Sequence, residues 1–221
     1  LLLKMGGSGV AMRTVLCDIS RSGEAGLVSS ATMRSGHSAA HVLHAAGVSY
    51  LIAIDSEEAR STLAVLVPKA EAFGEMQRRL EAEALGSFIA FSSISVLMPA
   101  PRQASYVAGN SCLDTLASIS NHRGDAATSP QWPAVSDVGM AEGNRFATAI
   151  SSQVVIAAIS RLATEPSWCE GDAVQAVMPS LALLRLQLPR PLRGLLSGLQ
   201  MELACAEMQT AMVSARSARA A

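Results

Sequence analysis

Short apolar runs alternate with helix-length segments along most of this chain, and that alternation constrains its fold more than any other feature. Apolar runs separated by helices are typical of a parallel sheet whose strands are joined by crossover helices. The run Ser-Phe-Ile-Ala-Phe-Ser that begins at Ser87 is apolar enough to be buried on both faces of such a sheet. We therefore predict an α/β fold with strands over residues 13–17, 41–44, 87–92, 127–132 and 173–178.

The segments between these runs predict helices over residues 57–85, 106–122 and 146–162. Pro68 and Gly74 interrupt the first helix, and Pro130 is unusual inside a strand because proline cannot donate to the ladder. Residues 179–191 have the character of a linker, and residues 195–213 predict an amphipathic helix. The methionine-rich stripe of that last helix is better explained by packing than by a cofactor site.

Composition narrows the classes of partner. The 221 residues suffice for one medium-sized domain, and a hydrophobic content of 50% favours a folded chain. The formal net charge of -1 gives no electrostatic reason to expect a nucleic acid or an anionic membrane. The apolar stretches fall short of the roughly 18 residues that a membrane span needs.

Cysteine and histidine spacing predicts no metal site. The four cysteines are far apart and form no Cys-x-x-Cys pair, which favours free thiols in the cytoplasm or another reducing compartment. His37, His41 and His44 suggest a metal cluster at first sight. If residues 41–44 form a strand, however, His41 and His44 point to opposite faces of the sheet.

Chemically informative residues gather in two neighbouring stretches, Phe91-Ser92-Ser93-Ile94 and the run Gln-Ala-Ser-Tyr-Val-Ala-Gly-Asn from Gln103 to Asn110. Each residue has a plain structural alternative. A serine pair after a strand is often a helix cap, a lone tyrosine is often a packed amphipathic residue, and a lone lysine is often a solvated charge. What favours an active site is the combination of these residues at particular spacings.

The spacings resemble those of the short-chain dehydrogenase/reductase superfamily, and within it the ketoreductase domains of modular polyketide synthases and animal-type fatty acid synthases. In that superfamily a serine lies thirteen residues before the catalytic tyrosine, which selects Ser93 for Tyr106 over Ser92 and Ser95. Most members have lysine four residues after the tyrosine. The polyketide type has asparagine there, as Asn110 here, and takes its lysine from the preceding helix. Lys69, which is 24 residues before Ser93, matches that position.

The resemblance implies a role for each of these residues. Reduction of a ketone needs a hydride at carbon and a proton at oxygen. Tyr106 would donate the proton, and the Lys69 ammonium would favour the phenolate and contact the cofactor ribose. Ser93 would donate a hydrogen bond to the substrate carbonyl oxygen, and Asn110 would support Lys69 or a proton-relay water.

Flanking motifs extend the resemblance over roughly residues 13–179. Asp18 and Ile19 would lie near the adenine ring, and the run His-Ala-Ala-Gly from His44 through Ala45 and Ala46 to Gly47 would line the cofactor cleft. Two further sets of residues would complete the site: Trp132 and Pro133 at the cofactor, and Gln103, Gly139 and Met140 at the substrate.

The family's glycine-rich phosphate loop has no counterpart in the expected place. The run Gly-Gly-Ser-Gly at residues 6–9 stands directly before a predicted strand, without the helix that such a loop opens. We therefore expect a Rossmann-like, doubly wound sheet that lacks its first strand–helix–strand unit, and poor NADPH binding by this chain alone. Residues 1–180 would form this partial ketoreductase domain, and residues 181–221 a linker and C-terminal helix.

The resemblance implies NADPH-dependent reduction of a β-ketoacyl thioester, carried on an acyl carrier protein, to the β-hydroxyacyl thioester. The reaction would take place within a polyketide synthase, beside other domains of the megasynthase. The alternative is a non-catalytic, scaffold-like relic of a ketoreductase. The retained Lys69, Ser93, Tyr106 and Asn110 favour the enzyme.

Overall fold

A parallel sheet lies at the centre of the computed structural model, which describes residues 15–19, 21, 23, 24, 26–28, 30, 39–81, 85–142, 149–164 and 174–176. The prediction of an α/β fold is confirmed. The described sheet has five strands, which are β1 (His41–His44), β2 (Ser87–Ala90), β3 (Ser92–Ser93), β4 (Ala127–Trp132) and β5 (Val174–Ala176).

All described pairings in the sheet are parallel. β1 pairs with β2, and β2 pairs with the first half of β4. β3 continues the line of β2 after Phe91 and pairs with the end of β4, whose other side pairs with β5. β4 pairs first with β2 and then with β3, and Pro130 lies between these two pairings. Ile89 pairs with Thr128 before it, and Ser92 pairs with Gln131 after it. A residue without an N–H is tolerated at such an interruption of the ladder.

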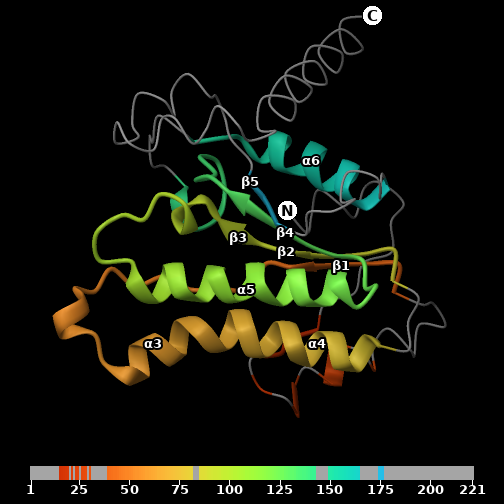
Figure 1. Ribbon diagram of the computed structural model, residues 1–221, viewed down its shortest axis with the longest axis horizontal. Helices are drawn as coiled ribbons and strands as arrows, with labels where there is room; N and C mark the ends of the chain where they lie inside the picture. Colours follow the sequence, from red (N-terminus) through yellow and green to blue (C-terminus); the bar gives the residue numbers. More distant parts are fainter. Residues whose placement is uncertain are drawn as a thin grey trace, which may run out of the picture.

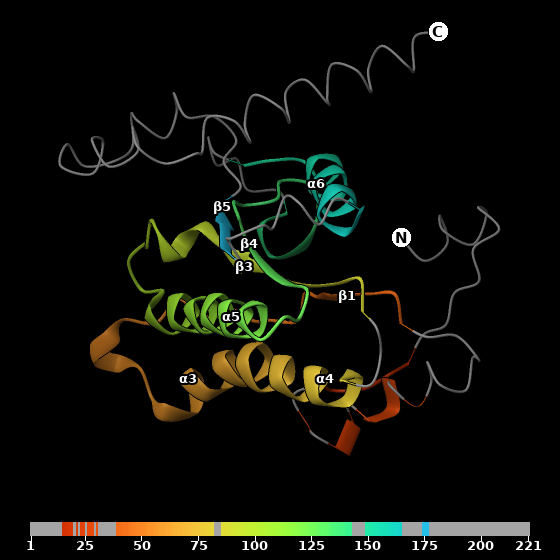
Figure 2. The same ribbon diagram turned by 45° about the vertical axis from the view of Figure 1, so that its right-hand side comes forward.

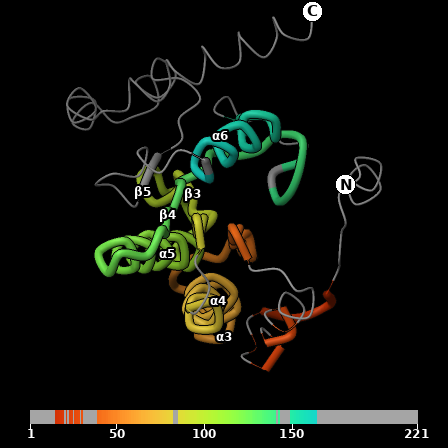
Figure 3. Tube along the Cα trace, turned by 90° about the vertical axis from the view of Figure 1, so that its right-hand side faces the viewer, coloured from red at the N-terminus to blue at the C-terminus, as the bar shows by residue number. Residues whose placement is uncertain are grey.

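Helices cover both faces of the sheet (Figure 1). α6 (Ser152–Thr164) lies on one face. The other face carries α5 (Ala104–His122) and a continuous helical segment made of α3 (Ala59–Leu66), the π-helical turn η3 (Val67–Glu71) and α4 (Ala72–Leu80). Figure 3, which looks along the helices, shows α5 beside α3 and α4. Short 3-10 turns are η2 (Ile54–Ser56), η4 (Ile94–Val96) and η5 (Gly139–Ala141).

Two apolar clusters hold these layers together. One lies between the sheet and the α4–α5 layer and includes Phe73, whose ring meets Phe88 edge-on at a centroid distance of 4.7 Å. The other lies between the sheet and α6 and is built around Trp132, Ile150 and Val155. All four residues of β2 are buried, as expected for a strand that is covered on both faces.

The prediction of a strand over residues 13–17 is wrong for its described part. Val15 to Asp18 has no strand conformation, and Leu16 is 97% exposed. A strand needs a neighbour to satisfy its backbone groups, and in the doubly wound order this one would not be adjacent to β1. Further along the chain, Gly26 meets the Arg79 guanidinium of α4, and Val28 packs against the core cluster that α4 helps to form (Figure 2).

The helix predicted from residue 146 begins at Ser152 in the described part of the chain. Ile150 is extended and forms a parallel bridge with Val135, so the helix cannot start before it. The Asp137 carboxylate then accepts hydrogen bonds from the N–H and hydroxyl of Ser152, both at 2.7 Å. Both the predicted linker and the predicted C-terminal helix lie outside the described residues.

Candidate active site

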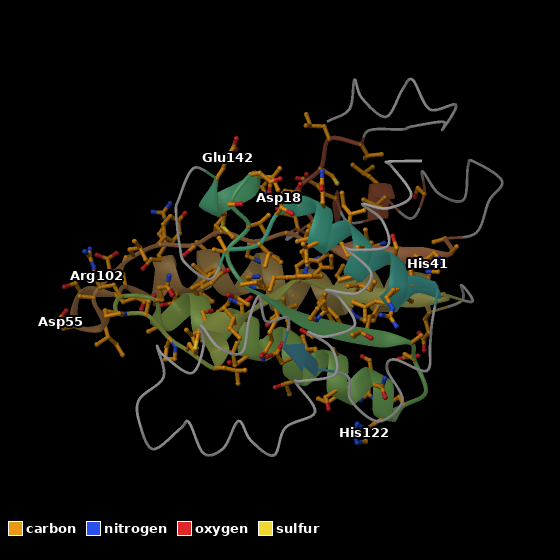
Figure 4. All side chains as sticks on the ribbon, turned by 90° about the horizontal axis from the view of Figure 1, so that it is seen from above. Asp18, His41, Asp55, Arg102, His122 and Glu142 are labelled. Atoms are coloured by element: carbon orange, nitrogen blue, oxygen red, sulfur yellow. The ribbon has the colours of Figure 1, made fainter. Side chains whose placement is uncertain are left out.

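Several of the site residues predicted from sequence lie at one edge of the sheet. β1 ends at His44, β3 at Ser93 and β4 at Trp132, so the carboxyl ends of the strands meet there. Figure 4 shows Arg102 and Asp55 at this end of the molecule, and His41 and His122 at the opposite end. α5 therefore begins at the edge where ligands bind in open parallel sheets.

Lys69 extends from the middle of the α3–α4 segment into the space between the helices and the sheet, and it is only 3% exposed. Its ammonium donates a hydrogen bond to the main-chain carbonyl of Phe91 at 3.2 Å. The same nitrogen lies 5.6 Å from the centre of the Tyr106 ring. A cation at this distance from an aromatic face is attracted by the ring's quadrupole.

Burial lowers the pKa of Lys69 to about 8, because a charged ammonium is disfavoured away from water. The carboxylate of Asp114 on α5 opposes this effect and raises the pKa. Asp114 is itself buried and accepts two hydrogen bonds from β4, from the Ser129 hydroxyl and the Gln131 amide, each at 2.7 Å. These two hydrogen bonds tie Asp114 on α5 to β4.

The π-helical turn explains how Lys69 comes to face the sheet. Pro68 cannot donate to the helical ladder, and the turn widens there into η3. The carbonyl of Lys69 accepts a hydrogen bond from Nε2 of His44 at 3.1 Å. Because a carbonyl can only accept, Nε2 carries the proton, and burial lowers the pKa of His44 so that the ring stays neutral. His44 thus anchors the backbone of Lys69.

Tyr106, Asn110 and Asp114 are spaced by four residues and share one face of α5. The side-chain amide of Asn110 donates to the Tyr106 carbonyl at 2.8 Å. Asn110 is fully buried, and its Oδ1 has no hydrogen-bond partner among the described residues. An acceptor left in this state favours a site that a polar ligand or a water molecule completes.

The two serines after β2 have different environments. Ser92 is buried, and its hydroxyl donates to the main-chain carbonyl of Asn110 at 3.4 Å. Ser93 is partly exposed, and its hydroxyl oxygen accepts from the Ser95 N–H at 3.2 Å. That leaves the Ser93 O–H as a donor for a ligand. Ser93 also pairs in the sheet with Trp132, next to Gln131.

The other predicted ligand residues are placed at varying distances from this centre. Gly47, Ala45 and Ala46 follow β1 at the same edge, with Gly47 against the Lys69 side chain. Gln103 is the N-terminal flanking residue of α5. Gly139 and Met140 form the exposed turn η5, where Met140 is 64% exposed.

Two pairs of the predicted cofactor contacts, Trp132 with Pro133 and Asp18 with Ile19, have mainly structural surroundings. Trp132 is buried against Phe91 and the α6 cluster, and Pro133 beside it is buried as well. Asp18 and Ile19 have no strand conformation and precede Gly26 and Val28, which contact α4 and the core. Asp18 is 53% exposed on its side chain, pairs with Arg21 and donates its N–H to Glu24.

Sequence reasoning missed Asp114, Gly109 and the carbonyl of Phe91. Asp114 could have been found, because it follows Asn110 by one helical turn and an acid on the same helix face as the predicted catalytic tyrosine is unusual. A main-chain carbonyl carries no signal in side-chain identity. Within the described part, no three His, Cys, Asp or Glu side chains come together as metal ligands would. Nor does any helix described there reach the length and apolarity of a membrane span.

Comparison with known proteins gives consistent results. The profile of a family described as the KR domain matches residues 1–137. The 6-methylsalicylic acid synthase of Aspergillus terreus is 36% identical over 120 residues, which are 54% of this chain and 7% of that protein. The ketoreductase from the first module of phoslactomycin biosynthesis in Streptomyces has a TM-score of 0.71 and 27% identity, over 87% of this chain and 46% of its own. A 4-hydroxyisoleucine dehydrogenase complexed with NADH and succinate shares the fold, with a TM-score of 0.62 and 18% identity over 74% of this chain and 79% of its own.

Proposed function

The chain belongs to the ketoreductase (KR) domain family of polyketide synthases, and on that premise we propose that it reduces a β-ketoacyl thioester on an acyl carrier protein, with NADPH as reductant. The observation that carries this proposal is the buried Lys69 ammonium 5.6 Å from the centre of the Tyr106 ring, at the carboxyl edge of the parallel sheet. A cation beside a phenol is the arrangement that proton donation to a developing alkoxide needs.

The residues present suit a nicotinamide nucleotide. An ammonium has three N–H donors, and among the described residues only the Phe91 carbonyl accepts from Lys69. The remaining donors suit the two hydroxyls of a ribose. The bound cofactor would supply the hydride. The orphaned Oδ1 of Asn110 suits a water molecule or hydroxyl in the same place.

Protein side chains would manage the proton and the charge. As the substrate's carbonyl oxygen becomes negative, the Tyr106 hydroxyl gives up its proton to that oxygen, and the phenolate left behind is stabilised by the Lys69 ammonium. The Ser93 hydroxyl donates a hydrogen bond to the same oxygen. Asn110 holds the first turn of α5 through the Tyr106 carbonyl and so keeps the phenol in register.

The neighbouring domains in this proposal follow from the relatives, and the carrier protein follows from the resemblance to the ketoreductases of polyketide synthases. The chain spans 7% of the length of the 6-methylsalicylic acid synthase that it matches and less than half of the phoslactomycin ketoreductase. We therefore propose that the substrate arrives as a thioester on a carrier protein, and that the domain works beside other domains of a polyketide synthase.

The test is a reduction assay on the natural protein that contains this chain. A β-ketoacyl thioester of N-acetylcysteamine serves as a soluble substrate, with NADPH consumption and the β-hydroxyacyl product measured together. We expect reduction in the wild type and none in a Lys69→Met variant that is folded. A folded wild-type protein that consumes no NADPH with this substrate would overturn the proposal and favour the scaffold-like alternative.

A further inference from the structure

The side chain of Lys69 passes between two glycines on its way to Phe91. A Cβ at Gly47, in the loop after β1, would lie 3.0 Å from Cε and 3.1 Å from Nζ of Lys69. A Cβ at Gly109, on α5, would lie 3.2 Å from Cδ of the same side chain. Each distance is shorter than ordinary van der Waals contact, so a larger residue at either position would push the lysine side chain aside by a few tenths of an ångström.

Neither glycine is required by its own backbone. The described glycines with positive φ are Gly124 and Gly139, and neither Gly47 nor Gly109 is among them. Gly109 lies inside the 19-residue helix α5, where glycine is less favourable than every residue but proline. A glycine at such a position calls for a packing reason, and the close approach of Lys69 supplies it.

Gly74 provides the contrast within the same layer of helices. It lies inside α4, but a Cβ there would meet nothing within 4 Å. A helical glycine in this protein therefore does not by itself imply a close neighbour. Among the described glycines, Gly47 and Gly109 are the two whose close neighbour is the Lys69 side chain.

We propose that Gly47 and Gly109 are positioning residues, which hold the Lys69 ammonium beside Tyr106 by leaving room for the tip and the middle of the lysine side chain. The proposal rests on the reductase function proposed above, in which that ammonium acts on the tyrosine. The two glycines bound the side chain at its middle and its tip, while the His44 ring fixes the Lys69 carbonyl at its base. The lysine is thus located at three points along its length.

The composition of the chain allows a direct test, because Lys4 and Lys69 are its only lysines. Protein labelled with 13C-lysine gives two Cε signals in NMR for these two residues, and the one that is missing from a Lys69→Ala protein belongs to the buried lysine. We expect Gly47→Ala and Gly109→Ala each to change the chemical shift of this signal, by altering its distance from the Tyr106 ring, and to move its titration midpoint away from about 8. Gly74→Ala is the matched control and should leave both unchanged.

A folded Gly47→Ala or Gly109→Ala protein with the wild-type Lys69 shift and midpoint would overturn the proposal. The two glycines lie on different elements, so a variant that fails to fold leaves the other to decide. A second measurement uses the Lys69→Ala background, where the side chain that would collide is gone. In that background Gly109→Ala should raise the midpoint of urea unfolding, because alanine favours the helix and no longer meets a lysine. In the wild-type background the same substitution should raise the midpoint less, or lower it.

Activity gives an independent readout. In the natural protein, Gly47→Ala and Gly109→Ala should lower kcat for reduction, but by less than the roughly 100-fold that a misplacement of about 1 Å costs, because the lysine has to give by only a few tenths of an ångström. If the NMR signal moves but the wild type reduces no substrate, the positioning holds and the reductase function fails. If reduction is robust and the Lys69 signal does not respond to either glycine, the function holds and the positioning proposal fails.

Discussion

The Lys69 ammonium donates a hydrogen bond to the main-chain carbonyl of Phe91, 3.2 Å away, and so ties the helical layer to the sheet where β2 gives way to β3. The N–H of Phe91 donates to the main-chain carbonyl of His44, the last residue of β1. Because β1 ends there, it has no further residue to pair with the Phe91 carbonyl. Ser92 and Ser93 follow directly. One hydrogen bond therefore fixes the lysine beside both the strand end and the tyrosine.

The buried charge of Lys69 predicts a stability effect with a defined pH window. Burial lowers the pKa of Lys69 to about 8 from an unfolded value of 10.5, so below pH 8 the native state holds a charge that the unfolded chain solvates better. The cost is of the order of 3 kcal/mol. A Lys69→Met variant should thus unfold at a higher urea concentration than the wild type at about pH 7.

The difference in urea midpoint between Lys69→Met and the wild type should shrink as the pH rises from about 8 to 10.5. In that window the unfolded chain binds more protons than the native state, so the wild type gains stability while the methionine variant does not. Urea titrations at about pH 7 and about pH 9.5 measure the difference. An equal gap at both pH values would show that the Lys69 charge is not buried in solution.

Asp114 is expected to keep Lys69 protonated. Its carboxylate raises the pKa of Lys69, opposing the effect of burial. Asp114→Asn preserves the shape of the side chain and removes its charge, so the Lys69 titration midpoint should fall below that of the wild type. The exchange also disturbs the bonds from Ser129 and Gln131 and should lower the free energy of unfolding by about 1–3 kcal/mol.

The same 13C-lysine titration measures the effect of Asp114. Asp125→Asn is a suitable control, because that acid follows α5 in an exposed turn beyond His122. A midpoint for Asp114→Asn that equals the wild-type value would exclude a direct electrostatic role for the carboxylate. A higher midpoint would mean that the exchange had opened the site to water.

Ser93 and Ser92 offer a matched pair of substitutions. Ser93→Ala removes the partly exposed hydroxyl that would bind the substrate oxygen, and kcat for reduction should fall about 100-fold. The Ser95 N–H also loses its acceptor, which costs about 1 kcal/mol of stability. Ser92→Ala removes a buried hydroxyl that faces the Asn110 carbonyl, so its effect should appear in stability and hardly in kcat.

Steady-state reduction assays and urea unfolding of the two variants separate these roles. A larger loss of kcat for Ser92→Ala than for Ser93→Ala would show that the spacing rule had selected the wrong serine. Comparable losses for both would indicate that the strand end as a whole, rather than one hydroxyl, is required.

Much of the fold could be predicted because its signals are local. The strand over residues 127–132 has the predicted bounds, and β1 ends at His44 as the pattern indicates. The strand expected over residues 13–17 was wrong in its described part, because an apolar run does not reveal whether a neighbour is present to pair with it. The late start of α6 depends on the bridge between Val135 and Ile150, which no local pattern encodes.

The candidate site divides in the same way. Spacing brought Lys69, Ser93, Tyr106 and Asn110 into one hypothesis, and the structure places Lys69 beside Tyr106 and Asn110 one turn further along α5. Their roles stay predictions. The contacts that hold Lys69 could not be predicted from the sequence. The Phe91 carbonyl belongs to the main chain, and Gly47 and Gly109 contribute only by having no side chain where Lys69 lies.

The assigned proton donor gives the most direct test of the mechanism. Tyr106→Phe keeps the ring beside the Lys69 ammonium and the backbone carbonyl that Asn110 holds, and it removes only the hydroxyl. Reduction in the natural protein should therefore fall by about 100- to 10,000-fold, the contribution expected of a positioned acid. NADPH binding, measured by fluorescence titration, should keep its Kd, and the urea midpoint should stay close to the wild-type value. Loss of NADPH binding together with activity would assign Tyr106 to the cofactor site instead of the proton transfer. Full activity of the phenylalanine variant would show that the phenol takes no part in the reaction. The proposed role of the buried Lys69 beside it would then fail as well.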